Sequence, residues 1–114
     1  MKYALLIYED EAVYGPDKAG PRIQEVVGKH MDFAQGLGPK RLGGAGLKGT
    51  TSATTVRTSA GRKTVHDGPF AEAKEQLGGF YLIEASDLDE AIAIAKKVPI
   101  LQDGAIEIRP VLGP

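Results

Sequence analysis

The hydrophobic pattern of the chain begins with a strand. Residues 2–8 are apolar on both faces of a period-two pattern, which is typical of a central strand covered on one side and partly buried on the other. A second such run, residues 78–85, contains Phe80, Tyr81, Leu82 and Ile83 in succession. Aromatic and β-branched residues favour strands. Both segments are therefore predicted to lie at the centre of a sheet.

Two other segments repeat their apolar residues at helical spacing. The first covers residues 23–37 and ends in a stretch rich in glycine and proline. The second begins at Asp87, which we expect to cap it, with Glu90 three residues later in the capping-box position. Its buried stripe is predicted to consist of Leu88, Ala91, Ile92, Ala95 and Val98. Each helix follows a predicted strand.

Shorter segments complete the pattern. Residues 41–45 are predicted to form a short strand. Residues 105–111 alternate between apolar and charged side chains, which is typical of an edge strand with one solvent-exposed face. Two β-branched segments flank the four-residue connection Ser59-Ala60-Gly61-Arg62, which predicts a hairpin. We expect a flexible loop over residues 46–53 and one helical turn over residues 71–76.

The resulting order is strand, helix, strand, hairpin, strand, helix, strand. This order predicts an α+β fold, a ferredoxin-like protomer with an inserted β-hairpin. Two helices cover only one face of such a sheet. Because the central strands are apolar on both faces, the other face is expected to pack against the same face of a second copy. We therefore predict a homodimer with face-to-face sheets.

Composition narrows the classes of function. The 114 residues suit one domain, residues 1–114, with a formal net charge of −1, which gives no bulk attraction to nucleic acid or to a membrane surface. There is no cysteine, so disulfides and thiolate chemistry are excluded. The apolar start is cut by three acidic residues, too early for a signal peptide. We expect a cytoplasmic protein that binds neither nucleic acid nor membrane.

Residues 67–83, with the sequence DGPFAEAKEQLGGFYLI, closely resemble the signature of the YCII-related family, in the branch named for its DGPF motif. The resemblance extends over nearly the whole chain. It implies a dimeric α+β barrel built from ferredoxin-like protomers. Some relatives in the wider superfamily are small lyases or dehydrochlorinases that use a His-Asp pair, and some members of the branch are associated with sigma factors of the extracytoplasmic-function type. Fold alone does not give the activity.

Two residues are the candidate catalytic groups. His30 falls on the apolar stripe of the first helix, so its imidazole is expected to face the sheet. It is either a core or interface histidine or, if it faces a cavity, a proton carrier near neutral pH. Asp67 precedes Gly68 and Pro69 in a turn. Its carboxylate either closes an Asx-turn or orients an imidazole, that of the neighbouring His66 or that of His30 across the cleft.

Four further residues are candidate binding groups, each with a simpler structural interpretation. His66 ends the second hairpin strand and is expected to be partly exposed. Arg57 on the hairpin is suited to an anionic ligand or to the protection of an exposed strand. Phe70 and Lys74 belong to the signature, where Lys74 lines a pocket mouth or is simply solvated.

More familiar motifs fail in their context. Residues 44–49 match G-x-G-x-x-G literally, but no helix follows to hold a pyrophosphate. Residues 79–81 resemble the strand that binds RNA, but the chain lacks a basic face. Two histidines without cysteine do not make a zinc site. We therefore expect no cofactor and no metal.

Two functions remain open at this stage. The first is a cofactor-free lyase, isomerase or dehydrochlorinase in which His30 and Asp67 carry out acid-base chemistry on a small molecule. The alternative is a non-catalytic dimeric module that binds a ligand or joins a regulatory complex, with an extracytoplasmic-function sigma factor as one partner. The distance between the imidazole and the carboxylate discriminates between them.

Overall fold

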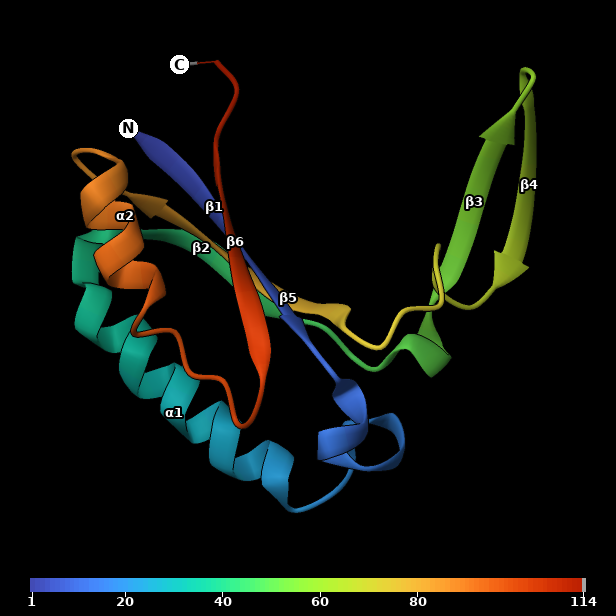
Figure 1. Cartoon of the computed structure of the whole chain (residues 1–114), viewed down its shortest axis with the longest axis horizontal. Coiled ribbons are helices and arrows are strands. Elements are labelled where there is room, and N and C mark those ends of the chain that lie inside the picture. The colour runs from blue at the N-terminus through green and yellow to red at the C-terminus, as the bar shows by residue number, and fades with distance from the viewer. Residues whose placement is uncertain (114) are drawn as a thin grey trace.

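The computed structural model describes residues 1–113, which form six strands and two α-helices (Figure 1). In chain order these elements are β1 (Lys2–Glu9), α1 (Arg22–Leu37), β2 (Arg41–Gly46), β3 (Thr54–Ser59), β4 (Arg62–Asp67), β5 (Gln76–Glu84), α2 (Leu88–Ala95) and β6 (Gly104–Pro110). The mixed α+β class is confirmed, and the strands and helices predicted from the hydrophobic pattern are present.

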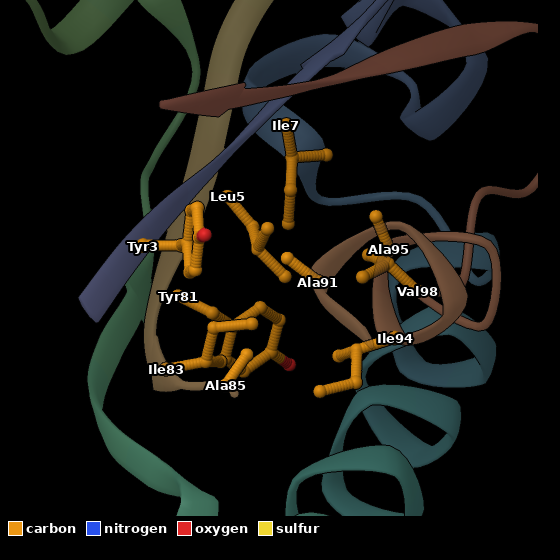
Figure 2. Close-up of a cluster of buried hydrophobic side chains, with 10 residues drawn as sticks. All are labelled: Tyr3, Leu5, Ile7, Tyr81, Ile83, Ala85, Ala91, Ile94, Ala95 and Val98. Carbon is orange, nitrogen blue, oxygen red and sulfur yellow. The ribbon is translucent and has the colours of Figure 1, made fainter. Parts of the chain in front are cut away.

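Four strands form one antiparallel sheet in the order β2-β5-β1-β6. Both α-helices lie on the same face of this sheet (Figure 1). Alternate residues of β1 and β5 point toward α2 in Figure 2, where they meet Ala91 and Val98. Leu5 and Ile83 are fully buried at the centre of this core. The core therefore lies between the helices and one face of the sheet, as period-two burial requires.

The opposite face of the sheet is apolar and partly open. It carries Ala4, Leu6 and Tyr8 from β1 and Phe80 from β5, all of intermediate exposure, and Leu82, which is 36% exposed. Their register places Leu6 beside Phe80 and Ala4 beside Leu82. The central strands are thus apolar on both faces, as the sequence predicts.

Strands β3 and β4 form a separate two-stranded sheet that projects from the body (Figure 1). The turn between them consists of two residues, because Ser59 pairs with Arg62. Ala60 and Gly61 have φ values of 52° and 77°. Two successive positive φ values give the turn whose twist matches that of the strands. The prediction of a four-residue connection was wrong by one residue at each end.

Two further predictions are corrected. Residues 71–76 contain no helical turn: the side-chain amide of Gln76 donates to the carbonyls of Ala71 and Ala73, and Gln76 itself begins β5. In α2 the capping prediction holds, since Asp87 accepts from the Glu90 amide at 2.9 Å. The predicted buried stripe was wrong at two positions: Leu88, which it included, is 50% exposed, and Ile94, which it omitted, is buried.

The predicted flexible loop after β2 contains one short 3₁₀ turn, Thr50–Ser52. The Glu11 carboxylate anchors this turn from a distant part of the chain. It accepts the Thr50 backbone N–H at 3.0 Å and also the Thr50 hydroxyl. No helix among the described residues is long and apolar enough to cross a membrane.

Candidate functional site

A cavity of about 690 Å³ opens between α1 and the β2 side of the sheet. One wall is apolar and comes from α1, with Val26, Val27, Met31 and Ala34. The opposite wall comes from the sheet and includes Ile7 and Tyr81. This volume suits a small organic molecule, which pockets of this kind enclose with a mostly apolar lining and a few polar groups.

The central polar feature of the cavity is a hydrogen bond between His30 on α1 and Tyr81 on β5. The distance from His30 Nδ1 to Tyr81 Oη is 2.8 Å. Tyr81 is only 7% exposed, and Phe33 packs edge-on against its ring with the ring centres 5.1 Å apart. The pair is therefore held by the helix on one side and the sheet on the other.

Gly44 on β2 makes room for the Tyr81 ring. The two residues are direct partners in the antiparallel ladder, and Gly44 has a φ of 153°. A Cβ atom at Gly44 would lie 2.6 Å from the Phe80 carbonyl oxygen and 3.0 Å from Tyr81 Cδ1. Only glycine fits so close an approach of two backbones. Strand β2, predicted over residues 41–45, thus lies in close contact with the backbone and ring of Tyr81.

Burial keeps both members of the pair neutral. Burial lowers the pKa of His30 from 6.5, while the negative charge of Glu9 and a hydrogen bond to the Pro99 backbone oppose this shift. Burial likewise raises the pKa of Tyr81 above 10.0, against the opposing charge of Arg41. At neutral pH an imidazole and a phenol therefore face each other, and each keeps its single proton.

The donor and acceptor roles in this hydrogen bond depend on the tautomer of His30. When the neutral imidazole carries its proton on Nε2, Nδ1 accepts the hydrogen bond from the Tyr81 hydroxyl. The remaining lone pair of the hydroxyl oxygen is then available to a ligand.

A second buried polar pair lies in the same cavity. Glu9, at the end of β1, is 9% exposed and accepts a hydrogen bond from the Tyr14 hydroxyl. Burial, together with this bond and the charge of Glu9, raises the pKa of Tyr14. The Glu9 charge also reaches His30, where it favours the protonated imidazole. Together with Glu11, which also lines it, the cavity thus contains an imidazole, two phenols and two carboxylates.

Three cationic side chains line the cavity. Lys18 donates to the Leu47 carbonyl at 2.8 Å and lies over the Tyr14 ring. Arg41 lies with its guanidinium carbon 6.0 Å from the centre of the Tyr81 ring. Within residues 1–113, neither Arg41 nor Lys48 forms an ion pair. Two of the three cations are therefore free to meet a ligand.

The structure separates the two predicted catalytic residues within one chain. His30 lines the cavity, as the catalytic interpretation requires. Asp67 ends β4, pairs with Thr54 and is exposed; it is not among the residues that line this cavity. The pairing of His30 with Asp67 is therefore not present within one chain.

Three of the four predicted binding residues lie on the hairpin or contact it instead. His66 is exposed opposite Thr55 in the β3-β4 ladder. Arg57 lies 4.9 Å above the ring of Phe70, which is 64% exposed. Phe70 lines a second hollow of about 650 Å³, on the side of Tyr8 and Leu77. Lys74 is exposed and lines neither cavity.

Sequence reasoning missed the partners of His30. Tyr81 lies within an apolar run, so its hydroxyl was not recognised as a functional group. Glu9 carried a signal, since it shares the parity of Tyr3, Leu5 and Ile7 and must face the helices with them. A carboxylate that continues the buried side of a strand is a candidate site residue.

Comparison with known proteins places the chain in a family. The sequence model of the YCII-related domain matches residues 1–113. A protein of Rhizobium meliloti (strain 1021) is 43% identical over 117 residues, which cover 96% of this chain and 91% of that protein. That relative is named as an uncharacterized protein. The matches show the family, and the name of this relative assigns no activity.

Proposed function

The chain belongs to the YCII-related family, and we propose that it is a small acid-base enzyme in which the His30–Tyr81 pair moves a proton to and from a small molecule. The observation that carries this proposal is the 2.8 Å hydrogen bond between the two side chains in the wall of the cavity. The proposed chemistry is of the lyase, isomerase or dehydrochlorinase type, and it needs no cofactor.

The proton follows a short relay. A C–H or O–H bond of the substrate breaks, and its proton passes to Tyr81 Oη as the phenol proton passes to His30 Nδ1. The products of this step are a substrate anion, an unchanged phenol and an imidazolium cation, so the charge balances. Glu9 favours the cation through its negative charge. Return of the proton to another atom of the substrate, or loss of a leaving group, completes the reaction.

The protonation states match this direction of transfer. A general base must be unprotonated at the working pH, and burial holds the pKa of His30 below 6.5. Burial raises the pKa of Tyr81, so its hydroxyl is protonated at neutral pH. Tyr81 therefore relays the proton to His30 and does not remain as a phenolate. A ligand seated against the apolar wall from α1 would displace water and thereby strengthen these interactions.

We further propose a ferredoxin-like protomer that pairs through the open face of its sheet into a dimeric barrel, within the DGPF branch. The strand order β2-β5-β1-β6 and the hairpin between β2 and β5 support the protomer. The apolar residues Leu6, Phe80 and Leu82 support the interface. Light scattering at micromolar concentration should give the mass of two chains, and Leu82→Glu should give that of one. A control change at the similarly exposed Leu88 on α2 should leave the dimer intact.

Asp67 retains a role in this proposal as a residue that a second subunit supplies. It stands at the base of the projecting hairpin, outside the cavity of its own chain. The carboxylate would enter the partner's site if the base of the hairpin lay beside that site in the dimer. Loss of turnover in Asp67→Asn, with retention of the dimer, would support this arrangement. Unchanged turnover would remove Asp67 from the mechanism.

A screen for proton exchange tests the function without a known substrate. A library of small carbonyl compounds is incubated with the enzyme in deuterated water, and NMR follows the loss of C–H signals. The wild type should accelerate exchange or turnover of at least one compound. His30→Gln should abolish this activity, because the amide cannot accept the proton, while His66→Gln serves as the matched control. Equal activity of His30→Gln and the wild type would refute the proposal.

The exposed hairpin favours a second candidate function, that of a binding or regulatory module. Val56 and Val65 face each other across the β3-β4 ladder and are 61% and 68% exposed. An isolated two-stranded hairpin is marginally stable in water. Exposed apolar side chains on such a hairpin are typical of a surface that contacts a partner. Ligand binding without any exchange or turnover in the screen would favour this function.

A further inference from the structure

We propose that the cavity selects a small organic acid, with an apolar body against α1 and its anionic group on Arg41. This inference rests on the proposed function, since it names the class of molecule on which the His30–Tyr81 pair acts. The inference is based on the position of Arg41 in the cavity and on the apolar side chains that α1 contributes to the cavity wall.

Arg41 is placed at the sheet edge on the same side as the active pair. It is the direct ladder partner of Ile83, whose side chain is fully buried on the helix-facing side. Directly paired residues point to the same face of a sheet. The guanidinium therefore lies on the cavity side, 6.0 Å from the centre of the Tyr81 ring. An anion held there would share the cavity with the Tyr81 side chain.

The guanidinium has no anionic partner among the described residues. The cavity carboxylates are already engaged: Glu9 accepts the Tyr14 hydroxyl, and Glu11 accepts the Thr50 amide. Arg41 offers donors in a fixed fork that matches a carboxylate. Its free donors and its place beside Tyr81 make it the anchor for an acid group.

The rest of the cavity fits an apolar body. Val27 and Met31 on α1 are 45% and 68% exposed although both line the cavity. Exposed apolar side chains around a pocket are covered when an apolar ligand enters. With the anion at Arg41, this body lies along α1. The atom that loses its proton then lies between the two ends, at the Tyr81 hydroxyl.

The relay and the anchor support each other electrostatically. A substrate that loses a proton becomes more negative, and the cationic Arg41 lines the same cavity as the Tyr81 ring near which that charge develops. A fixed cation beside the developing charge stabilises the transition state more than the ground state. This arrangement favours acids whose reactive C–H or O–H is separated from the carboxylate by a short spacer.

Binding of unreactive probes tests the inference. The probes are benzoate, phenylacetate and 3-phenylpropionate, each compared with its neutral amide by NMR titration. At least one acid should bind the wild type, and its amide should bind at least tenfold more weakly. Arg41→Gln should weaken the acid about tenfold and leave the amide unchanged, and Arg41→Lys should restore part of the affinity. Arg57→Gln is the matched control, because Arg57 also stacks on an aromatic ring but lies outside the cavity.

Three results would overturn the assignment. These are equal affinities of an acid and its amide, equal effects of the Arg41 and Arg57 changes, and dissociation constants above about 10 mM for all three acids. Binding of these probes requires no proton transfer, so His30→Gln should still bind the acid. Acid binding without activity in the exchange screen would therefore refute the enzyme and keep the anion site. Activity without Arg41-dependent binding would do the reverse.

Discussion

Replacement of Tyr81 by phenylalanine removes one oxygen atom from the centre of the site. The ring stays, so the packing against Phe33 is preserved, but His30 Nδ1 loses its partner at 2.8 Å. An unsatisfied buried polar group costs roughly 1–3 kcal/mol. Because His30 is partly exposed, we expect the lower part of this range, about 1–2 kcal/mol. At about 2.1 cal/mol/K per residue, the 114 residues give an unfolding entropy near 240 cal/mol/K. The melting temperature should then fall by about 4–8 °C.

Urea denaturation and calorimetry measure this loss, and Tyr3→Phe is the matched control. Tyr3 is also a buried tyrosine on a central strand, 2% exposed, but within residues 1–113 its hydroxyl has only the Met1 sulfur, at 3.7 Å, as a hydrogen-bond partner. Its loss should cost less than about 0.5 kcal/mol. The double change of Tyr81→Phe with His30→Ala should show a coupling energy of about 1 kcal/mol. Equal effects of the two tyrosine changes, or additive effects in the cycle, would refute the hydrogen bond as described.

Three other predictions follow from the site. NMR titration should place the pKa of His30 below 6.5, and Glu9→Gln should lower it further, because the Glu9 charge favours the imidazolium. Since the unfolded chain then binds more protons than the folded one, the stability contributed by neutral His30 is complete above about pH 6.5 and is lost as the pH falls toward the folded pKa. His30→Gln should remove this dependence in urea denaturation, and an unchanged pH profile would contradict it. Gly44→Ala should destabilise the fold by about 2 kcal/mol or more, because the new Cβ would lie 2.6 Å from the Phe80 carbonyl oxygen. Gly43→Ala is the control and should cost less, because its nearest contact would be at 4.0 Å. Equal losses of stability in the two variants would argue against the close approach at Gly44.

The order of elements was readable from the sequence because the apolar period changes clearly from two to about four along the chain. The Asp87 cap was readable for a related reason. A short side chain with an acceptor oxygen, placed just before an apolar helical stripe, accepts a hydrogen bond from a free N–H at the start of the helix. Such local signals extend over a few residues, and they fixed β1, α1, β5 and α2 within one to three residues at their ends.

The composition of the site was less readable because its contacts join distant parts of the chain. His30 was recognised as a polar residue on an apolar stripe, but its partner Tyr81 is 51 positions away and looks like any other core aromatic. The local sequence also favoured a helical turn over residues 71–76. Pairing of Gln76 with Glu9 in the sheet decided that segment instead, which is a tertiary effect that a local pattern does not contain.

A pH profile tests the role of His30 most directly. The rate of substrate proton exchange is measured from pH 4 to 9 alongside an NMR titration of His30 in the same sample. If the neutral imidazole is the base, the rate should fall as the pH drops, with a midpoint equal to the pKa of His30, and Glu9→Gln should move both to lower pH together. A midpoint unrelated to the pKa of His30, or one that stays fixed when that pKa moves, would contradict the account.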